Sequence, residues 1–177
     1  MIAVVSCLHY PDDERIYHKE IKTLVKGEIH ISYFSRSESN LDLSDQFISH
    51  INFQKSNFSI RAYKRELLRH FLENKPKILH IHEPELLPLA KMVKRLFDTK
   101  VIYDVHEDYP SLIQTFSRWG KLIRIFQEKI WLRKEKQFLS WVDEIILAGP
   151  AIINSGYKEN GFIPVVMENF PSGELIR

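Results

Sequence analysis

Glycine and cysteine are scarce in this sequence, and each scarcity excludes a class of protein. Six glycines occur among 177 residues, with none between Glu28 and Trp119 and none in the polar turn at residues 6–15. Glycine-rich loops let backbone N–H groups approach a phosphate closely, so a dinucleotide fingerprint or a Walker loop is excluded. The one cysteine, Cys7, excludes a disulfide framework. We interpret it as a small buried apolar side chain in a reducing environment, rather than as a catalytic nucleophile.

Long apolar runs are also missing. No stretch approaches the roughly 20 apolar residues that a membrane-spanning helix needs. The first residues, Met1 to Val5, lack the basic start and the small-residue cleavage site of a signal peptide, and they are typical of a β-strand. We therefore expect a cytoplasmic protein, and the length predicts one main domain with a substantial core.

Charge is nearly balanced overall, with a formal net charge of +2, but one segment is strongly basic. Residues 118–136 hold seven basic and two acidic side chains, which gives a local net charge of +5. The excess of basic residues is confined to this one predicted helix, and no nucleic-acid motif accompanies it. We therefore expect no nucleic-acid partner.

Strand-like and helix-like segments alternate along the chain. Apolar, β-branched strands are predicted at residues 2–6, 29–34, 47–53, 78–81, 100–104, 144–148 and 165–167. Helices are predicted at residues 14–26, 60–73, 84–97, 121–141 and 151–160, and residues 35–45 are predicted to form a loop. This order predicts an α/β fold: a Rossmann-like parallel sheet with helices on both faces.

Two of the predicted strands end in ionisable side chains. Residues 78–82 place His80 and His82 in a short apolar strand, and Glu83 follows directly. Residues 101–103 are apolar β-formers, and they lead into Asp104, His106 and further polar groups. Ligands of open α/β sheets bind outside the carboxyl ends of the strands, so these side chains are expected to line a crevice there.

Three segments, taken in order, resemble the N-terminal half of GT-B glycosyltransferases of family 4, which build cell-surface glycans. The segments are residues 9–20 (HYPDDERIYHKE), 80–87 (HIHEPELL) and 101–110 (VIYDVHEDYP). A weaker match, residues 165–171 (VVMENFP), is similar to the family's crossover between two Rossmann-like domains. The resemblance implies that residues 1–164 form the acceptor-side domain. It also implies that residues 165–177 begin the crossover to a C-terminal domain absent from these 177 residues.

The resemblance also implies a function. It is the acceptor-binding half of a retaining-type enzyme that moves a hexose from a nucleotide-sugar to a cell-surface glycan or lipid-linked acceptor. The partners would be that acceptor and a C-terminal domain, in the same or a separate chain, which binds most of the donor. No cofactor is expected, and the 177 residues alone are expected to be inactive. One departure is Glu83, which stands where relatives usually carry aspartate.

The resemblance gives His106 the catalytic role, because family 4 enzymes commonly place a histidine here against the donor sugar. An imidazole at this position can hydrogen-bond a hydroxyl or ease developing charge. The simpler alternative is a histidine that caps the end of a strand. The expected substrate-binding residues are His9, Asp13, Arg15, His82, Glu83, Glu107, Asp108 and Tyr109.

Some of these residues have structural explanations that need no substrate. Asp13 and Asp108 each stand where a helix N-cap is expected. Arg15 in the first helical turn opposes the helix dipole, which predicts an anionic partner: a phosphate, a carboxylate or Asp13 itself.

A metal site is an alternative interpretation of the histidines. His80 and His82 are two residues apart and therefore share one face of their strand, and His106 and Glu83 follow the two strand ends. Such a set has metal-binding chemistry. However, strand histidines often only pack and hydrogen-bond, and GT-B enzymes generally need no metal, so no metal is expected.

The basic segment has two interpretations. Apolar residues recur there at helical spacing: Trp119, Leu122, Ile123, Phe126 and Ile130. Either this face packs in the core with the basic residues in water, or it docks on an anionic membrane at the inner face of the cell. The second interpretation places Trp119 or Trp131 at the interface and assigns lipid contacts to Lys121, Arg124 and Lys129.

Two other functions compete with the transferase. One is a catalytically silent Rossmann-like module that binds a partner or recruits it to a membrane. The other is a small α/β hydrolase or deacetylase built on the histidines. No nucleophile-elbow sequence is present, which disfavours the hydrolase.

Overall fold

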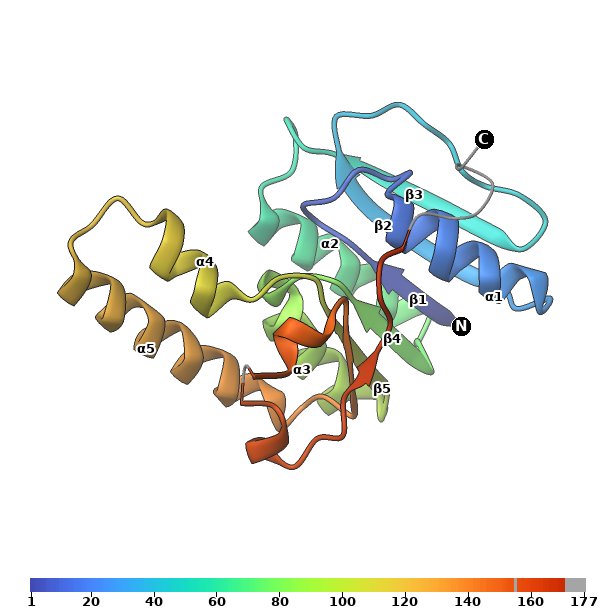
Figure 1. The fold of residues 1–177 in the computed structure, drawn as a ribbon. Coiled ribbons are helices and arrows are strands. Elements are labelled where there is room, and N and C mark those ends of the chain that lie inside the picture. The colour runs from blue at the N-terminus through green and yellow to red at the C-terminus, as the bar shows by residue number, and fades with distance from the viewer. Residues whose placement is uncertain (155, 171–177) are drawn as a thin grey trace.

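The computed structural model describes residues 1–154 and 156–170, and it shows one parallel β-sheet covered by helices (Figure 1). The strand order is β3-β2-β1-β4-β5-β6-β7, the doubly wound arrangement that an alternating strand–helix order favours. The strands are β1 Ile2–Val5, β2 Ile31–Ser37, β3 Ile48–Gln54, β4 Ile78–Ile81, β5 Lys100–Val105, β6 Glu144–Leu147 and β7 Val165–Val166. The predicted α/β class and parallel sheet are confirmed.

The helices follow the expected order, with differences in helix type and one additional helix. They are η1 Glu14–Ile21, α1 Lys22–Lys26, α2 Ile60–Glu73, η2 Pro84–Leu86, α3 Leu87–Phe97, α4 Tyr109–Phe116, α5 Lys121–Leu139, η3 Pro150–Asn154 and η4 Lys158–Asn160. The first predicted helix begins as a π-helix, η1, and continues as α1. The predicted helix at 151–160 is instead two short 3₁₀ segments, η3 and η4. Helix α4 was not predicted.

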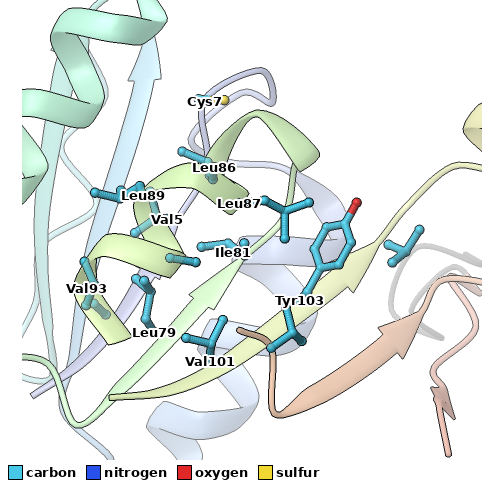
Figure 2. Packing of buried hydrophobic residues seen from close by; sticks show 14 of the residues in the cluster. Val5, Cys7, Leu79, Ile81, Leu86, Leu87, Leu89, Val93, Val101 and Tyr103 are labelled. Carbon is cyan, nitrogen blue, oxygen red and sulfur yellow. The ribbon is translucent and has the colours of Figure 1, made fainter. Parts of the chain in front are cut away.

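Side-chain alternation along the strands divides the core between the two faces of the sheet. Ala3 and Val5 of β1 pack with α2 and α3 on one face, while Val4 packs with η1 on the other. Figure 2 shows the first cluster, in which Leu79, Ile81 and Tyr103 from β4 and β5 meet the apolar side of α3. Helices therefore cover both faces, as predicted.

Helix α4 begins at an N-cap, Asp108, that the sequence indicates. Asp108 accepts hydrogen bonds from the backbone N of Ser111 at 3.3 Å and from its Oγ at 2.5 Å, and Pro110 occupies the first turn. Both are standard signals for a helix N-terminus. The sequence indicates an N-cap at Asp108, but the segment after it is not among the predicted helices.

Helices α4 and α5 lie against each other and reach away from the sheet (Figure 1). Of the residues of α5, Glu135 and Leu139 at its C-terminal end are buried. The apolar residues of its first half are exposed: Leu122 at 83% and Phe126 at 65%, with Ile123 and Ile130 also exposed. The interpretation that this face packs in the core is therefore wrong, because only the C-terminal end of α5 reaches the body of the domain.

Two further expectations concern membrane-spanning helices and the predicted crossover segment. In the described part of the chain, no helix is both long enough and apolar enough to cross a membrane. Strand β7 pairs in parallel with β6, through Ile146 with Val165 and Leu147 with Val166. Residues 171–177 of the predicted crossover lie outside the described residues.

Candidate functional site

The register of the sheet brings three ionisable side chains to one face. Leu79 and Ile81 of β4, and Tyr103 of β5, point into the core under α3. Because successive strand residues face opposite ways, His80 and Asp104 point to the η1 side, and His82 beyond β4 follows them there. These three side chains are buried. The sequence expectation that His80 and His82 share a face is confirmed by their ring centroids, which lie 4.4 Å apart.

The π-helical form of η1 supplies two more charged groups to this face. In an α-helix, residues five apart are separated by about 140° around the axis. A π-helix makes i→i+5 hydrogen bonds, as His18 N does to Asp13 O at 3.3 Å, so residues five apart come to the same side. Arg15 and Glu20 consequently both reach the sheet, and both are buried.

Arg15 and Asp104 form the central ion pair of the cluster. The guanidinium donates from Nε to Oδ2 and from Nη2 to Oδ1, each at 2.8 Å, a bidentate arrangement. Burial alone would raise the pKa of Asp104. Hydrogen bonds from His106, His82 and Arg15 outweigh burial and hold the pKa well below its ordinary value. The anionic partner predicted for Arg15 is thus a carboxylate, that of Asp104.

Two imidazoles converge on the same carboxylate oxygen. Oδ2 of Asp104 lies 3.1 Å from Nε2 of His106 and 3.4 Å from Nδ1 of His82. The two ring nitrogens are themselves 3.1 Å apart. The His82 side chain is fully buried, whereas 10% of the His106 side chain is exposed. His106 is therefore the outer member of the pair, and Asp104 holds both rings.

Glu20 lies beneath the histidines. Its Oε1 is 3.2 Å from Nε of Arg15, and its Oε2 is 3.8 Å from Nε2 of both His80 and His82. Within the described residues, both Glu20 oxygens and both Nε2 atoms are buried without a hydrogen-bond partner. Burial, reinforced by the charge of Asp104, raises the pKa of Glu20 to about 9. Burial also lowers the pKa of His80 to about 3, so that imidazole is neutral.

A second, more exposed pair stands at the rim of this cluster. Nδ1 of His9 lies 3.2 Å from Oδ2 of Asp13, and the His9 ring is 4.6 Å from that of His106. The hydrogen bond to Asp13 outweighs burial and raises the pKa of His9. Asp13 is also the expected N-cap, because its Oδ1 accepts from the backbone N of Arg15 at 2.9 Å and of Ile16 at 3.0 Å.

Glu83 occupies a different position from the other carboxylates. Its Oε1 accepts from Ser6 Oγ at 2.8 Å and from the backbone N of Cys7 and Leu8 at 2.9 and 2.8 Å. The side chain is buried and braces the loop after β1, which carries His9. Glu83 is therefore bound within the protein, by groups at the end of β1 and in the loop after it.

The three residues after His106 have different surroundings. Glu107 is exposed, and Asp108 caps α4. Tyr109 stacks on Trp131 of α5, with ring centroids 5.1 Å apart at 17°.

Sequence reasoning did not select Glu20 or Asp104 as site residues, although both stood within the quoted segments. Asp104 could have been found from alternation, since it shares the parity of His106 in the same strand. Glu20 could not, because a standard helix would turn a residue five positions from Arg15 away from the sheet.

The first helix also holds the C-terminal segment of the described chain. Nη1 of Arg15 donates to the carbonyl O of Met167 at 2.5 Å. Nζ of Lys19 donates to Oδ1 of Asn169 at 2.6 Å and to the carbonyl of Phe170. Arg15 thus joins the buried cluster to the segment predicted as the crossover.

No protein-family model and no curated protein matches this sequence. Among solved structures, the sucrose-phosphate synthase of Thermosynechococcus elongatus superposes with a TM-score of 0.65 at 13% identity, covering 99% of this chain and 92% of that chain. The Phytolacca americana glycosyltransferase UGT2, in its apo form, gives 0.55 at 10% identity, and apo OtsA gives 0.50 at 14%. This chain spans 54% of the UGT2 chain and 43% of the OtsA chain. These likenesses establish the fold, a Rossmann-like α/β domain that matches domains of GT-B glycosyltransferases.

Proposed function

We propose that this chain is the acceptor-side half of a family 4-like glycosyltransferase, one that moves a hexose from a nucleotide-sugar to a cell-surface glycan or lipid-linked acceptor. The observation that carries the proposal is the convergence of His9, His82, Asp104 and His106 where β1, β4 and β5 end. Doubly wound sheets bind ligands at this edge, where the strand order reverses. The match to GT-B domains supports the same assignment.

His106 is the proposed catalytic residue, and its neighbours fix its chemistry. Asp104 accepts from Nε2 of His106 at 3.1 Å, which favours the tautomer with the proton on that nitrogen. The lone pair of Nδ1 is then available to accept a hydrogen bond from a sugar hydroxyl. In the protonated form both nitrogens donate, and the ring can stabilise the charge of a departing diphosphate.

Four of the remaining predicted substrate-binding residues have proposed roles around this ring. His9 and Asp13 form the partly exposed rim, and the exposed Glu107 is the carboxylate proposed to accept from an acceptor hydroxyl. Arg15 acts through Asp104, which it keeps ionised. The donor would be held mostly by the opposing C-terminal domain, which closes over the edge.

The test is release of nucleoside diphosphate from a panel of UDP- and GDP-hexoses with a lipid-linked acceptor. The chain is assayed alone and together with the donor-binding domain encoded with it. We expect no release by the chain alone and turnover by the combination. We also expect His106→Ala to lower kcat/KM by about 100-fold or more, the range for loss of a group that stabilises the transition state.

The matched control is His30→Ala, which removes an exposed histidine just before β2, at the opposite edge of the sheet. Its turnover should equal that of the parent. Release by the isolated 177 residues would contradict the half-site. Full activity of His106→Ala in the combined enzyme would contradict its catalytic role.

A second candidate, a membrane-recruiting module, is favoured by the surface of α5. The exposed apolar residues Leu122 and Phe126 lie on a helix with a local excess of basic side chains, among them the exposed Lys121 and Lys129. Apolar and basic groups together on one helix are typical of docking on anionic lipid. Arg124 is the exception, because its guanidinium donates to the carbonyls of Trp119 and Gln114.

Vesicle sedimentation tests this candidate. The chain should bind vesicles that contain phosphatidylglycerol and leave phosphatidylcholine vesicles largely unbound. Replacing Leu122 and Phe126 with Glu should abolish binding, and Lys121→Glu with Lys129→Glu should weaken it most at low salt. Leu72→Glu, which changes an exposed leucine of α2, is the matched control. Equal binding by all variants would end the membrane assignment.

A further inference from the structure

We propose that Glu20, His80 and His82 form a binding site for a divalent transition-metal ion, zinc being the best match, beneath the proposed sugar site. The donor set is two imidazoles and one carboxylate, which is a common first shell for this ion. The sequence alone suggested Glu83 and His106 as companions of the two histidines. The tertiary structure replaces them with Glu20. The inference does not depend on the transferase assignment.

The geometry brings three donor atoms close together. Oε2 of Glu20 is 3.8 Å from Nε2 of His80 and 3.8 Å from Nε2 of His82. Together with Asp104, the four residues offer ligand atoms that all lie within 4.8 Å of one another. Bonds of about 2.0–2.2 Å in a tetrahedral site place ligand atoms about 3.4 Å apart, so movements of a few tenths of an ångström complete the site.

The hydrogen bonds around the cluster leave the correct atoms free. Nδ1 of His82 faces Oδ2 of Asp104, so its proton is directed there and the lone pair of Nε2 points toward Glu20. A carboxylate that holds the far nitrogen of a ligating imidazole is a standard outer shell for zinc. Oε1 of Glu20 is beside Arg15, at 3.2 Å from Nε, which leaves Oε2 for the ion.

The buried polar atoms need a partner of some kind. Both Nε2 atoms and both Glu20 oxygens are inaccessible and lack hydrogen-bond partners within the described chain. Leaving such groups unpaired destabilises the folded chain, and more so when the group is charged. One divalent ion satisfies three of these atoms together. The competing occupants are a proton on Glu20 or a single bridging water.

The experiment measures metal directly. The 177-residue chain is produced in zinc-supplemented medium, purified without chelator and analysed for metal content. A second sample is unfolded with chelator and refolded with Co²⁺, because the buried site should load during folding. We expect close to one equivalent of zinc. We also expect a visible Co²⁺ spectrum of the intense, low-coordinate type and a higher thermal midpoint with metal than without.

Variants locate the site. Glu20→Gln and His80→Gln should each weaken Co²⁺ binding by more than about 100-fold, since loss of an outer-shell partner alone typically costs 10–100-fold. His30→Gln removes an exposed histidine and should bind as the parent does. If a variant fails to fold, the stoichiometry and spectrum of the parent still decide.

Two results would overturn the proposal. One is a parent protein with no stoichiometric zinc and a Co²⁺ spectrum equal to that of the free aqueous ion. That result would leave a proton or a water between Glu20 and the histidines. The other is Co²⁺ binding that survives both Glu20→Gln and His80→Gln, which would move the metal elsewhere. Neither result bears on transferase activity, so the two proposals fail separately.

Discussion

Glu135 allows a quantitative test of the packing of α5 on the sheet. The side chain is buried, with 5% of the residue exposed. Its Oε1 accepts from the hydroxyl of Tyr157 at 2.8 Å and lies 3.4 Å from that of Tyr103. Burial raises the pKa of Glu135 from 4.5 to about 7, although the two hydroxyls work against the shift. The folded chain therefore holds this proton more tightly than the unfolded chain does.

The sign and size of the effect follow from proton linkage. A carboxyl whose folded pKa is raised stabilises the protein fully below its unfolded pKa, and this stability is lost as the pH rises through the folded pKa. With 4.5 for the unfolded and about 7 for the folded chain, the contribution falls by about 2.5 kcal/mol between pH 5 and pH 8. Glu135→Gln keeps the acceptor oxygen and removes the titration.

Urea unfolding of the parent and of Glu135→Gln, measured at pH 5, 6, 7 and 8, isolates this term from other titrating groups. We expect the variant to gain stability relative to the parent as the pH rises, by about 2.5 kcal/mol over the range. The control, Glu73→Gln, changes an exposed carboxylate of α2 and should show no such trend. A parent-minus-variant difference that is independent of pH would refute the burial of Glu135 against the two tyrosines.

Three further predictions follow from the described contacts. Asp104→Asn should lower the free energy of unfolding, measured by the same urea assay, by about 3–5 kcal/mol, because it leaves the buried Arg15 guanidinium without its bidentate partner. The control is Asp45→Asn, which changes an exposed ion pair and should cost at most about 1 kcal/mol. Cys7 is buried, and burial raises the pKa of its thiol, so a disulfide reagent should modify it only after denaturant is added. Rapid reaction of the native protein would contradict the burial of Cys7. Phe71→Ala should destabilise the protein by about 3–5 kcal/mol, because the ring is fully buried, and a loss below about 1 kcal/mol would show that the site is not close-packed.

The sequence indicated some features of the proposed site, and only the fold revealed the others. The segment around His106 indicated chemistry at a strand end because apolar β-formers gave way abruptly to ionisable groups. The pairing of Arg15 with a carboxylate was among the alternatives that the helix dipole suggested. That the carboxylate is Asp104, 89 residues away in sequence, follows from the strand order, which places the first helix over β4 and β5.

The apolar residues of α5 show the limit of periodicity as a guide. Leu122 and Phe126 recur at helical spacing, and that pattern predicted a helix correctly. It did not determine which surface the helix would meet. The unpredicted α4 packs beside α5, and the pair extends away from the sheet, so the apolar face stays exposed.

The sequence by itself determined the α/β class, the parallel sheet and the shared face of His80 and His82, because each depends on local periodicity and on the order of elements along the chain. Only the tertiary structure decided which charged groups meet. Glu20 lies close to His80 and His82 because η1 has π-helical geometry and packs over β4. Both are set by packing between distant segments, which no short stretch of sequence encodes.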